Sequence, residues 1–428
     1  MSCRSLVTLA LVLCAMVSLS AAEQPPAATS QGSPYLFVWA GDEARKASDF
    51  LAVIDANPAS SSYGRVVRTV RVGMTGTMPH HTEYKFPAGN ILFAEGWVAG
   101  HSFIFDLRRP LRPRLAAQFQ DRAGYSFPHS FARLPNGDVL ATFQSHGGAL
   151  AGEGGLVELR NDGSVVRAAS AVDPAVNEDL IWPYSLQVLP QLDRVVSSSS
   201  PMGWPDWGKL PPGSWTAKRI NDQVTSQLQI WRLSDLRLLK TISLPADSGK
   251  HNEAPSEPRL LPDGSIYVNT FTCGLYRVKD VTGPQPSAEL VHTFPGGDSA
   301  HTICSVPVVV GHYWIQTVAA LPGLIALDVS NPEKPVEVSR LVLDRRYPMP
   351  HWLAADRKSD RLVITGDMER WVLVARFDPQ KGKLTLDESF HAPGATVPGI
   401  LFDGRQAGKT APALVHGALF GPKSHTVR

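Results

Sequence analysis

The segment PHSFARLPNGDVLATF (residues 128–143) contains the pattern that predicts how this chain folds. A stretch with alternating apolar residues ends at Leu134, a Pro-Asn-Gly-Asp turn follows, and a second apolar stretch begins at Val139, as in a β-hairpin. A histidine, His129, stands near the start of the segment. Six other segments repeat the pattern with a histidine or a substitute in the same place, and they begin at His81, Tyr184, Ser256, His301, His351 and His416.

The seven segments follow one another at intervals of 45 to 72 residues, close to the length of a four-stranded propeller blade with its loops. One such blade cannot bury both faces of its sheet, whereas seven blades stacked around an axis form a continuous core. We therefore predict an all-β fold, a seven-bladed β-propeller that forms a single domain over residues 35–428. Apolar stretches between residues 37 and 70 precede the first repeat, so we expect one blade to combine strands from both ends of the chain.

The composition agrees with this fold and limits the function. The chain has 428 residues, with 41 Lys and Arg against 39 Asp and Glu, so it lacks the strong basic field of nucleic-acid binders. Its 35 Gly and 35 Pro favour many short strands joined by turns. We expect a small-molecule substrate and no nucleic-acid partner, while the oligomeric state stays open.

The N-terminal residues have the pattern of a secretory signal peptide. Arg4 precedes an apolar run over residues 6–17, and Ser20-Ala21-Ala22 offers a small-residue cleavage site. The run is too short for a permanent membrane span. We therefore predict a signal peptide over residues 1–22, a linker over 23–34, and a periplasmic or secreted protein without a membrane span.

Two cysteines, Cys273 and Cys304, lie beyond the predicted cleavage site. In an oxidising compartment they could form a disulfide, but they could equally remain buried thiols. The sequence does not distinguish these alternatives.

The repeated histidines indicate a metal site. The first strand of each propeller blade lines the axis, so residues at equivalent positions converge although they are far apart in sequence. A single histidine is more often structural than a ligand, but five of the seven segments begin with one. Imidazoles suit Zn, Cu, Fe and Ni rather than Ca or Mg. The predicted ligands are His81, His129, His301, His351 and His416, with the adjacent His80 as a further candidate.

The two remaining segments place other chemistry near the axis. Tyr184 begins one of them, and Glu257 or nearby Glu253 accompanies Ser256 in the other. A carboxylate there could orient a ligating imidazole or act as a base, and Tyr184 could handle protons. Three acidic residues that follow first strands are expected to be turn or solvent residues: Glu95, Asp138 and Asp367.

One long insertion, residues 197–227, is rich in Trp, Pro and Gly. Long loops in compact domains are often functional, and exposed Trp side chains are costly to leave in water. The insertion is therefore interpreted as a substrate lid that uses Trp204, Trp207 and Trp215. The alternative is a surface loop that its own aromatic side chains hold in place.

Four motifs resemble those of the selenium-binding protein family, which includes the bacterial methanethiol oxidases. They are DFLAVID at residues 49–55, MPHH at 78–81, the segment 328–335 (DVSNPEKP) and PALVH at 412–416. The resemblance implies a seven-bladed propeller, a copper centre ligated by histidines, and oxidation of a small thiol to an aldehyde, hydrogen sulfide and hydrogen peroxide.

The chain also departs from that family. It lacks the cysteine-rich N-terminal segment, and Thr82 rather than a cysteine follows the His-His pair. Gly417 follows His416, where the family has Glu. Selenium binding through those cysteines is therefore not implied for this chain.

Three functions follow from the sequence. The first is an exported copper-dependent oxidase of a small, sulfur-containing molecule, with dioxygen as the second substrate. The second is a non-catalytic metal-binding propeller whose faces dock a partner. The third is a non-haem iron dioxygenase, because several axial histidines also suit iron. Copper content together with peroxide release distinguishes the first from the other two.

Overall fold

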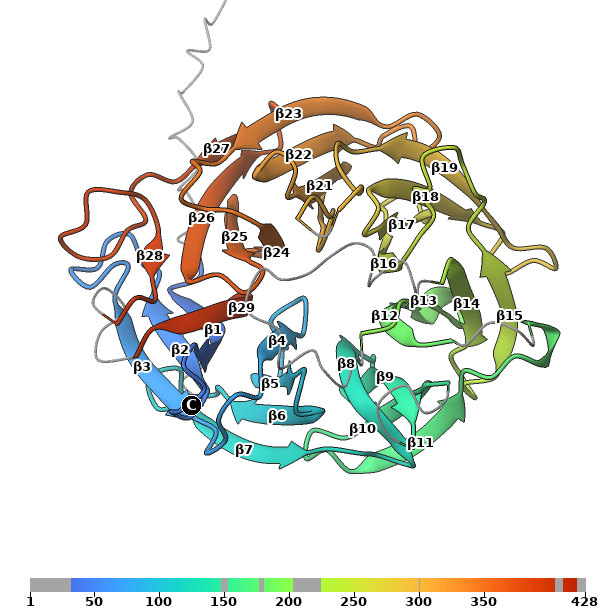
Figure 1. Ribbon diagram of the computed structural model, residues 1–428, viewed down its shortest axis with the longest axis horizontal. Helices are drawn as coiled ribbons and strands as arrows, with labels where there is room; N and C mark the ends of the chain where they lie inside the picture. Colours follow the sequence, from blue (N-terminus) through green and yellow to red (C-terminus); the bar gives the residue numbers. More distant parts are fainter. Residues whose placement is uncertain are drawn as a thin grey trace, which may run out of the picture. The chain divides into compact units, whose positions relative to one another are not determined.

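The computed structural model describes residues 32–147, 153–176, 181–202, 225–299, 301–404 and 411–421. These residues form seven antiparallel sheets arranged around a common axis, as Figure 1 shows. The prediction of an all-β, seven-bladed propeller is confirmed. The predicted signal peptide lies outside the described residues and stays a prediction.

One blade combines both ends of the chain, as predicted. Strand β29 comes from the C-terminus and pairs with β1, so that the ring closes through backbone hydrogen bonds. This blade contains β29 (Ala413–Gly421), β1 (Tyr35–Asp42), β2 (Phe50–Asp55) and β3 (Val66–Arg71). The second blade contains β4 (Pro79–Thr82), β5 (Ile91–Gly96), β6 (His101–Asp106) and β7 (Arg114–Phe119). The third contains β8 (Tyr125–Arg133), β9 (Val139–His146), β10 (Gly155–Leu159) and β11 (Val165–Ser170).

The remaining blades repeat this order from the axis outward. The fourth blade contains β12 (Pro183–Leu189), β13 (Arg194–Ser199), β14 (Gln227–Arg232) and β15 (Leu238–Ser243), and the fifth contains β16 (Pro255–Leu260), β17 (Ile266–Thr270), β18 (Gly274–Lys279) and β19 (Ser287–Thr293). The sixth blade contains β20 (Val308–Val310), β21 (Tyr313–Val318), β22 (Gly323–Asp328) and β23 (Val336–Val342). The seventh contains β24 (Pro350–Ala355), β25 (Arg361–Gly366), β26 (Trp371–Asp378) and β27 (Lys383–Leu386). A short strand, β28 (Ile400–Leu401), adds to β26, and two 3₁₀ turns span Pro174–Val176 and Pro190–Leu192.

The innermost strands share a β-bulge at the axis. In five blades the pairing with the second strand shifts directly after a proline: Pro79, Pro128, Pro183, Pro255 and Pro350. Proline at the start of a strand has no N–H to donate, and a bulge re-aims the side chains that follow it. In four of these blades the residue before the proline has a positive φ of 52° to 60°: Met78, Phe127, Ala254 and Met349.

The sheets pack against one another through buried apolar side chains from their central strands. Trp39, Trp231, Trp314 and Trp352 are almost fully buried between blades. Their indole N–H groups are satisfied; that of Trp352, for example, donates to the carbonyl of Ala418 at 2.8 Å. Stability is therefore distributed around the ring, and the axis is left to residues of other chemistry.

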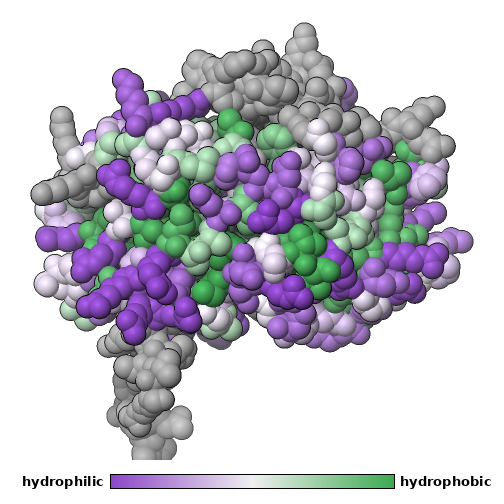
Figure 2. Space-filling view, turned by 90° about the horizontal axis from the view of Figure 1, so that it is seen from below, coloured by the Kyte–Doolittle hydropathy of each residue, from purple (hydrophilic) through white to green (hydrophobic). Residues whose placement is uncertain are grey.

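The outer strands face solvent. Hydrophilic side chains with smaller apolar patches cover the side seen in Figure 2. The largest exposed aliphatic side chains include Val336 and Val342 on β23. Within the described part of the chain, no helix has the length and apolar character needed to cross a bilayer.

A disulfide joins Cys273 to Cys304, with their Cα atoms 4.9 Å apart. It links the turn between β17 and β18 to the segment that precedes β20 in the next blade. The structure thus decides a pairing that the sequence left open.

Candidate metal centre

Five buried imidazoles from four blades meet at the axis. His80 and His81 lie on β4, His129 on β8, His351 on β24 and His416 on β29. One ring nitrogen from each of His80, His81, His351 and His416 lies within 4.8 Å of the others. His129 forms a second group with His80 and Glu95, and its ring centroid lies 4.5 Å from that of His81. The arrangement brings several ligand atoms within reach of one ion.

The bulge explains why both residues of the His80-His81 pair reach the axis. In a regular extended strand the two side chains would point to opposite faces, but the pairing of β4 with β5 shifts between Pro79 and Thr82. The two rings therefore stack at 4.1 Å with an interplanar angle of 7°. By its place after the proline, His80 rather than His81 is the equivalent of His129.

One of the two ring nitrogens of each imidazole lies beside a polar group of the protein. Such partners orient a ligating imidazole and select its tautomer. The pairs are His80 Nδ1 with Glu95 Oε1 at 2.6 Å, His129 Nδ1 with the Tyr184 carbonyl at 2.8 Å, His351 Nε2 with Ser305 Oγ at 3.0 Å, His81 Nδ1 with Tyr84 Oη at 3.2 Å, and His416 Nδ1 with Asp367 Oδ1 at 3.7 Å.

On four of the imidazoles the opposite ring nitrogen is buried without a hydrogen-bond partner among the described residues: His81 Nε2, His129 Nε2, His416 Nε2 and His351 Nδ1. A buried polar atom without a partner costs about 1–3 kcal/mol. A transition-metal ion would satisfy such nitrogens, and ring nitrogens of His80, His81, His351 and His416 lie within 4.8 Å of one another, so the residues present fit a metal site.

The imidazoles are uncharged at neutral pH. Burial lowers the pKa of His129 and of His351 to about 3. Burial and the neighbouring imidazoles hold the pKa values of His80, His81 and His416 well below 6.5. Only neutral imidazole has a lone pair for a metal, so burial keeps the cluster in its ligating form.

Two acidic residues that we expected in turns or solvent belong to this centre instead. Glu95 is fully buried at the end of β5, where Oε1 also accepts the backbone N–H of His81 at 2.9 Å. Burial raises the pKa of Glu95 well above its usual range. Asp367 follows β25 beside His416, and burial raises its pKa to about 7. The prediction for Glu95 and Asp367 was wrong because the second strand of a blade, like the first, approaches the axis beside the bulge. Asp138 does lie in its turn, hydrogen-bonded to Asn136.

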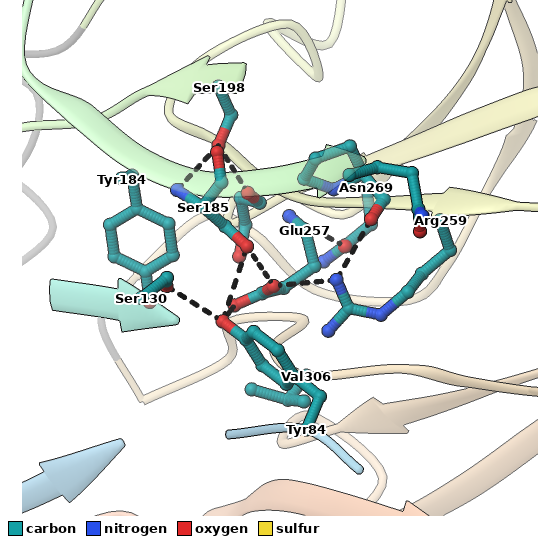
Figure 3. A network of polar contacts seen from close by, with 12 residues as sticks. Tyr84, Ser130, Tyr184, Ser185, Ser198, Glu257, Arg259, Asn269 and Val306 are labelled. Carbon is teal, nitrogen blue, oxygen red and sulfur yellow. Dashed lines mark hydrogen bonds and ion pairs between the residues drawn. The ribbon is translucent and has the colours of Figure 1, made fainter. Parts of the chain in front are cut away.

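A polar network surrounds Tyr84 and Glu257, as Figure 3 shows, and the Tyr84 hydroxyl connects it to His81. The hydroxyl of Tyr84 donates to Glu257 Oε1 at 2.8 Å and lies 2.9 Å from Ser130 Oγ and 3.2 Å from Ser185 Oγ. Burial and the charge of Glu257 raise the pKa of Tyr84 well above 10, so the phenol keeps its proton. Tyr84 could not be identified from the sequence, since no other repeat has a tyrosine three residues beyond the axial position.

Glu257 is the acidic partner of this network. It is fully buried, Arg259 Nη1 lies 3.0 Å from Oε2, and Ser185 Oγ donates to Oε2 at 2.5 Å. The guanidinium of Arg259 also lies over the ring of Tyr84, 4.1 Å from its centroid. Glu257 is thus separated from the imidazoles by the Tyr84 hydroxyl.

The other two candidates for proton transfer differ in position. The ring of Tyr184 lies 4.0 Å from that of His129, and its buried hydroxyl has no hydrogen-bond partner among the described residues. Burial and the charge of Glu257 hold the pKa of Tyr184 well above 10. Glu253 lies before β16, where its backbone pairs with Thr272, and it is not among the converging ligand groups.

The structure does not bring His301 to the converging imidazoles. Its side chain is exposed, and Ser305, four residues later, contacts His351 instead. The prediction for His301 was wrong because this blade has no proline bulge at the axis. Its inner strand β20 spans only three residues and begins after His301. His301 lines a cavity of about 460 Å³ together with Met349, Asp367 and Glu369. The predicted lid residues Trp204, Trp207 and Trp215 lie outside the described residues.

The chain is similar in sequence and in fold to known proteins. No model of a known protein family matches the chain. A methanethiol oxidase from Hyphomicrobium sp is 30% identical over 396 residues, which cover 83% of this chain and 85% of that protein. A methanethiol oxidase from Ruegeria pomeroyi is 26% identical over 74% of each chain. A hypothetical selenium-binding protein from Sulfolobus tokodaii shares the fold, with a TM-score of 0.71 at 15% identity over 90% of this chain and 93% of that one.

Proposed function

Since this chain belongs to the selenium-binding protein and methanethiol oxidase family, we propose that it is an exported copper-dependent oxidase of a small thiol. The reaction converts RCH₂SH, O₂ and H₂O into RCHO, H₂S and H₂O₂. The observation that carries the proposal is the set of buried, neutral imidazoles with four unsatisfied ring nitrogens on the axis.

The axial histidines would hold the copper ion. His81, His129, His351 and His416 each offer a free ring nitrogen, and His80 completes the set. Imidazole donors suit copper, with iron as the alternative. Bound copper supplies the redox steps that join thiol oxidation to the reduction of dioxygen.

The protein provides an apolar wall next to this centre. Trp97, Tyr184, Phe271 and Ile303 belong to one buried cluster, and the Trp97 ring lies 5.5 Å from that of His129. Such a wall excludes water and favours the alkyl part of a small thiol. The free hydroxyl of Tyr184 is placed to donate a hydrogen bond, or a proton, to a bound molecule.

The polar network supports the ligands. The Tyr84 hydroxyl donates to Glu257, so it can accept the Nδ1 proton of His81 and leave Nε2 of that ring free. Glu257 therefore acts through Tyr84 as a positioning residue. The disulfide between Cys273 and Cys304 supports the proposed export, because stable disulfides are typical of oxidising compartments.

The proposal is tested with protein purified without a His tag. We expect elemental analysis to find about one copper per chain, and methanethiol to yield hydrogen sulfide and peroxide in equal amounts. His129→Ala and His351→Ala should each lose most of the copper and the activity but keep the fold, since stability is spread over all the blades. His312→Ala, at an exposed position, is the matched control.

The alternatives predict other results. Iron instead of copper, with no peroxide release, would favour the dioxygenase. Bound metal without turnover of any small thiol would favour the non-catalytic propeller. Full copper occupancy in both axial variants would refute the assignment of these histidines as ligands.

A further inference from the structure

Methionine side chains gather beside the histidine centre. Five methionines lie in the described residues, and three of them, Met78, Met202 and Met349, pack in the apolar cluster around Trp97. Met368 joins them, because it lines the 460 Å³ cavity with Met349 and a smaller neighbouring cavity with Met78. Only Met74 packs elsewhere, against the core of the blade that closes the ring.

The sequence places two of these thioethers next to imidazoles. Met-Pro-His occurs twice, at residues 78–80 and 349–351, each time at the axial bulge. Both methionines have positive φ, 60° and 52°, and Met368 has a φ of 53°. The backbone therefore turns sharply at each of these three methionines.

The larger cavity also has two acidic side chains in its wall. Asp367 and Glu369 line it, and no Lys or Arg lies within ion-pair distance of either carboxylate in the part of the chain that the structure describes. The two arginines of the cavity wall have partners, with Arg370 paired to Glu43 at 2.5 Å and Arg346 to Asp344 at 2.9 Å. Asp367 in turn lies 3.7 Å from His416 Nδ1, so the cavity reaches the histidine centre.

Thioethers and carboxylates together select a particular ion. A thioether is a soft, neutral donor that favours Cu(I) over the harder divalent ions. Burial raises the pKa of both carboxyl groups to about 7, so an arriving cation can displace their protons. We infer that Met78, Met349 and Met368 form a loading site for Cu(I), from which the ion passes along Asp367 to the axial histidines. Its destination rests on the proposed function, whereas its preference for a soft monovalent cation does not.

The direct test uses Ag(I), a redox-inert probe of Cu(I) sites, on the complete metal-free protein with ¹³C-labelled methionine methyl groups. One equivalent of Ag(I) should shift the methyl signals of Met78, Met349 and Met368 and leave that of Met74 unchanged. Zn(II) binds imidazoles but not thioethers, so it should shift these signals far less than Ag(I) does. Equal shifts with Zn(II), or unmoved signals at Met349 and Met368, would overturn the loading site.

The kinetic test follows copper uptake from a Cu(I)–bicinchoninate complex. Met349→Leu/Met368→Leu conserves volume and should slow Cu(I) uptake about tenfold while the final copper content stays the same. Met74→Leu is the matched control and should load at the wild-type rate. Equal slowing in both variants would refute the inference. Methyl shifts with Ag(I) in protein that never holds copper at its histidines would support the loading site and contradict the proposed function.

Discussion

Replacing Tyr84 by phenylalanine should weaken metal binding without removing any ligand. The variant keeps the ring, which stacks on Trp352 with centroids 5.3 Å apart and lies beneath the guanidinium of Arg259. It removes only the hydroxyl, which donates to Glu257 and contacts His81 Nδ1.

Two magnitudes follow from these contacts. A hydrogen bond to a charged group contributes about 1.5–3 kcal/mol, and Glu257 keeps Arg259 and Ser185, so we expect a loss of about 2 kcal/mol in the free energy of unfolding. His81 loses the partner that selects its tautomer, and the loss of such a partner typically lowers metal affinity about 10- to 100-fold. Copper affinity should therefore fall by at least about tenfold in Tyr84→Phe.

Competition with a copper chelator measures the affinity, and chemical unfolding of the metal-free protein measures the stability. Tyr267→Phe is the matched control, because its hydroxyl donates to the carbonyl of Pro332 at 2.7 Å, in another part of the ring. The control should lose stability and keep its copper affinity. Unchanged affinity in Tyr84→Phe, or an equal loss in the control, would refute the positioning role.

Three further predictions concern pH, the disulfide and export. The pKa of His351 is about 3 in the folded protein and near 6.5 when unfolded, so only the unfolded state gains this proton as pH falls. Metal-free protein should therefore lose about 1.4 kcal/mol per pH unit from this residue between about pH 6.5 and pH 3, and His351→Ala should show a correspondingly shallower pH dependence of unfolding in that range; parallel curves would contradict this. The double variant Cys273→Ser/Cys304→Ser should lose about 4 kcal/mol of stability in chemical unfolding, because the bond closes a loop with a sequence separation of 31; a loss near zero would mean that the denatured chain is already constrained. N-terminal sequencing of protein from the exported fraction should begin near Glu23, and an intact Met1 in membranes would exclude the predicted cleavage.

Much of the fold could be predicted from local patterns. Short stretches of sequence are enough to predict hairpin turns and alternating strands, so seven repeats such as the one that contains His129 indicate seven blades. His129, His351 and His416 could be assigned to the axis because each begins the innermost strand of its blade or lies within it.

The composition of the centre depended on the tertiary structure. A bulge turned both His80 and His81 inward, whereas simple alternation would have separated them. Tyr84, Glu95 and Asp367 reach the imidazoles from positions that no repeat marks. His301 shows the opposite case, since it carries the expected residue type in a blade where Ser305 takes the place beside His351.

The physical reason is the range of the interactions involved. Strand periodicity and turn chemistry depend on residues that are neighbours in sequence, so both can be predicted from the sequence. The direction of a side chain at a bulge depends on backbone angles and on packing against the next blade, and the pairing of Cys273 with Cys304 depends on how two blades meet. The sequence by itself therefore determined the ring of blades and most of its axial histidines, and the packing of the blades decided which side chains surround them.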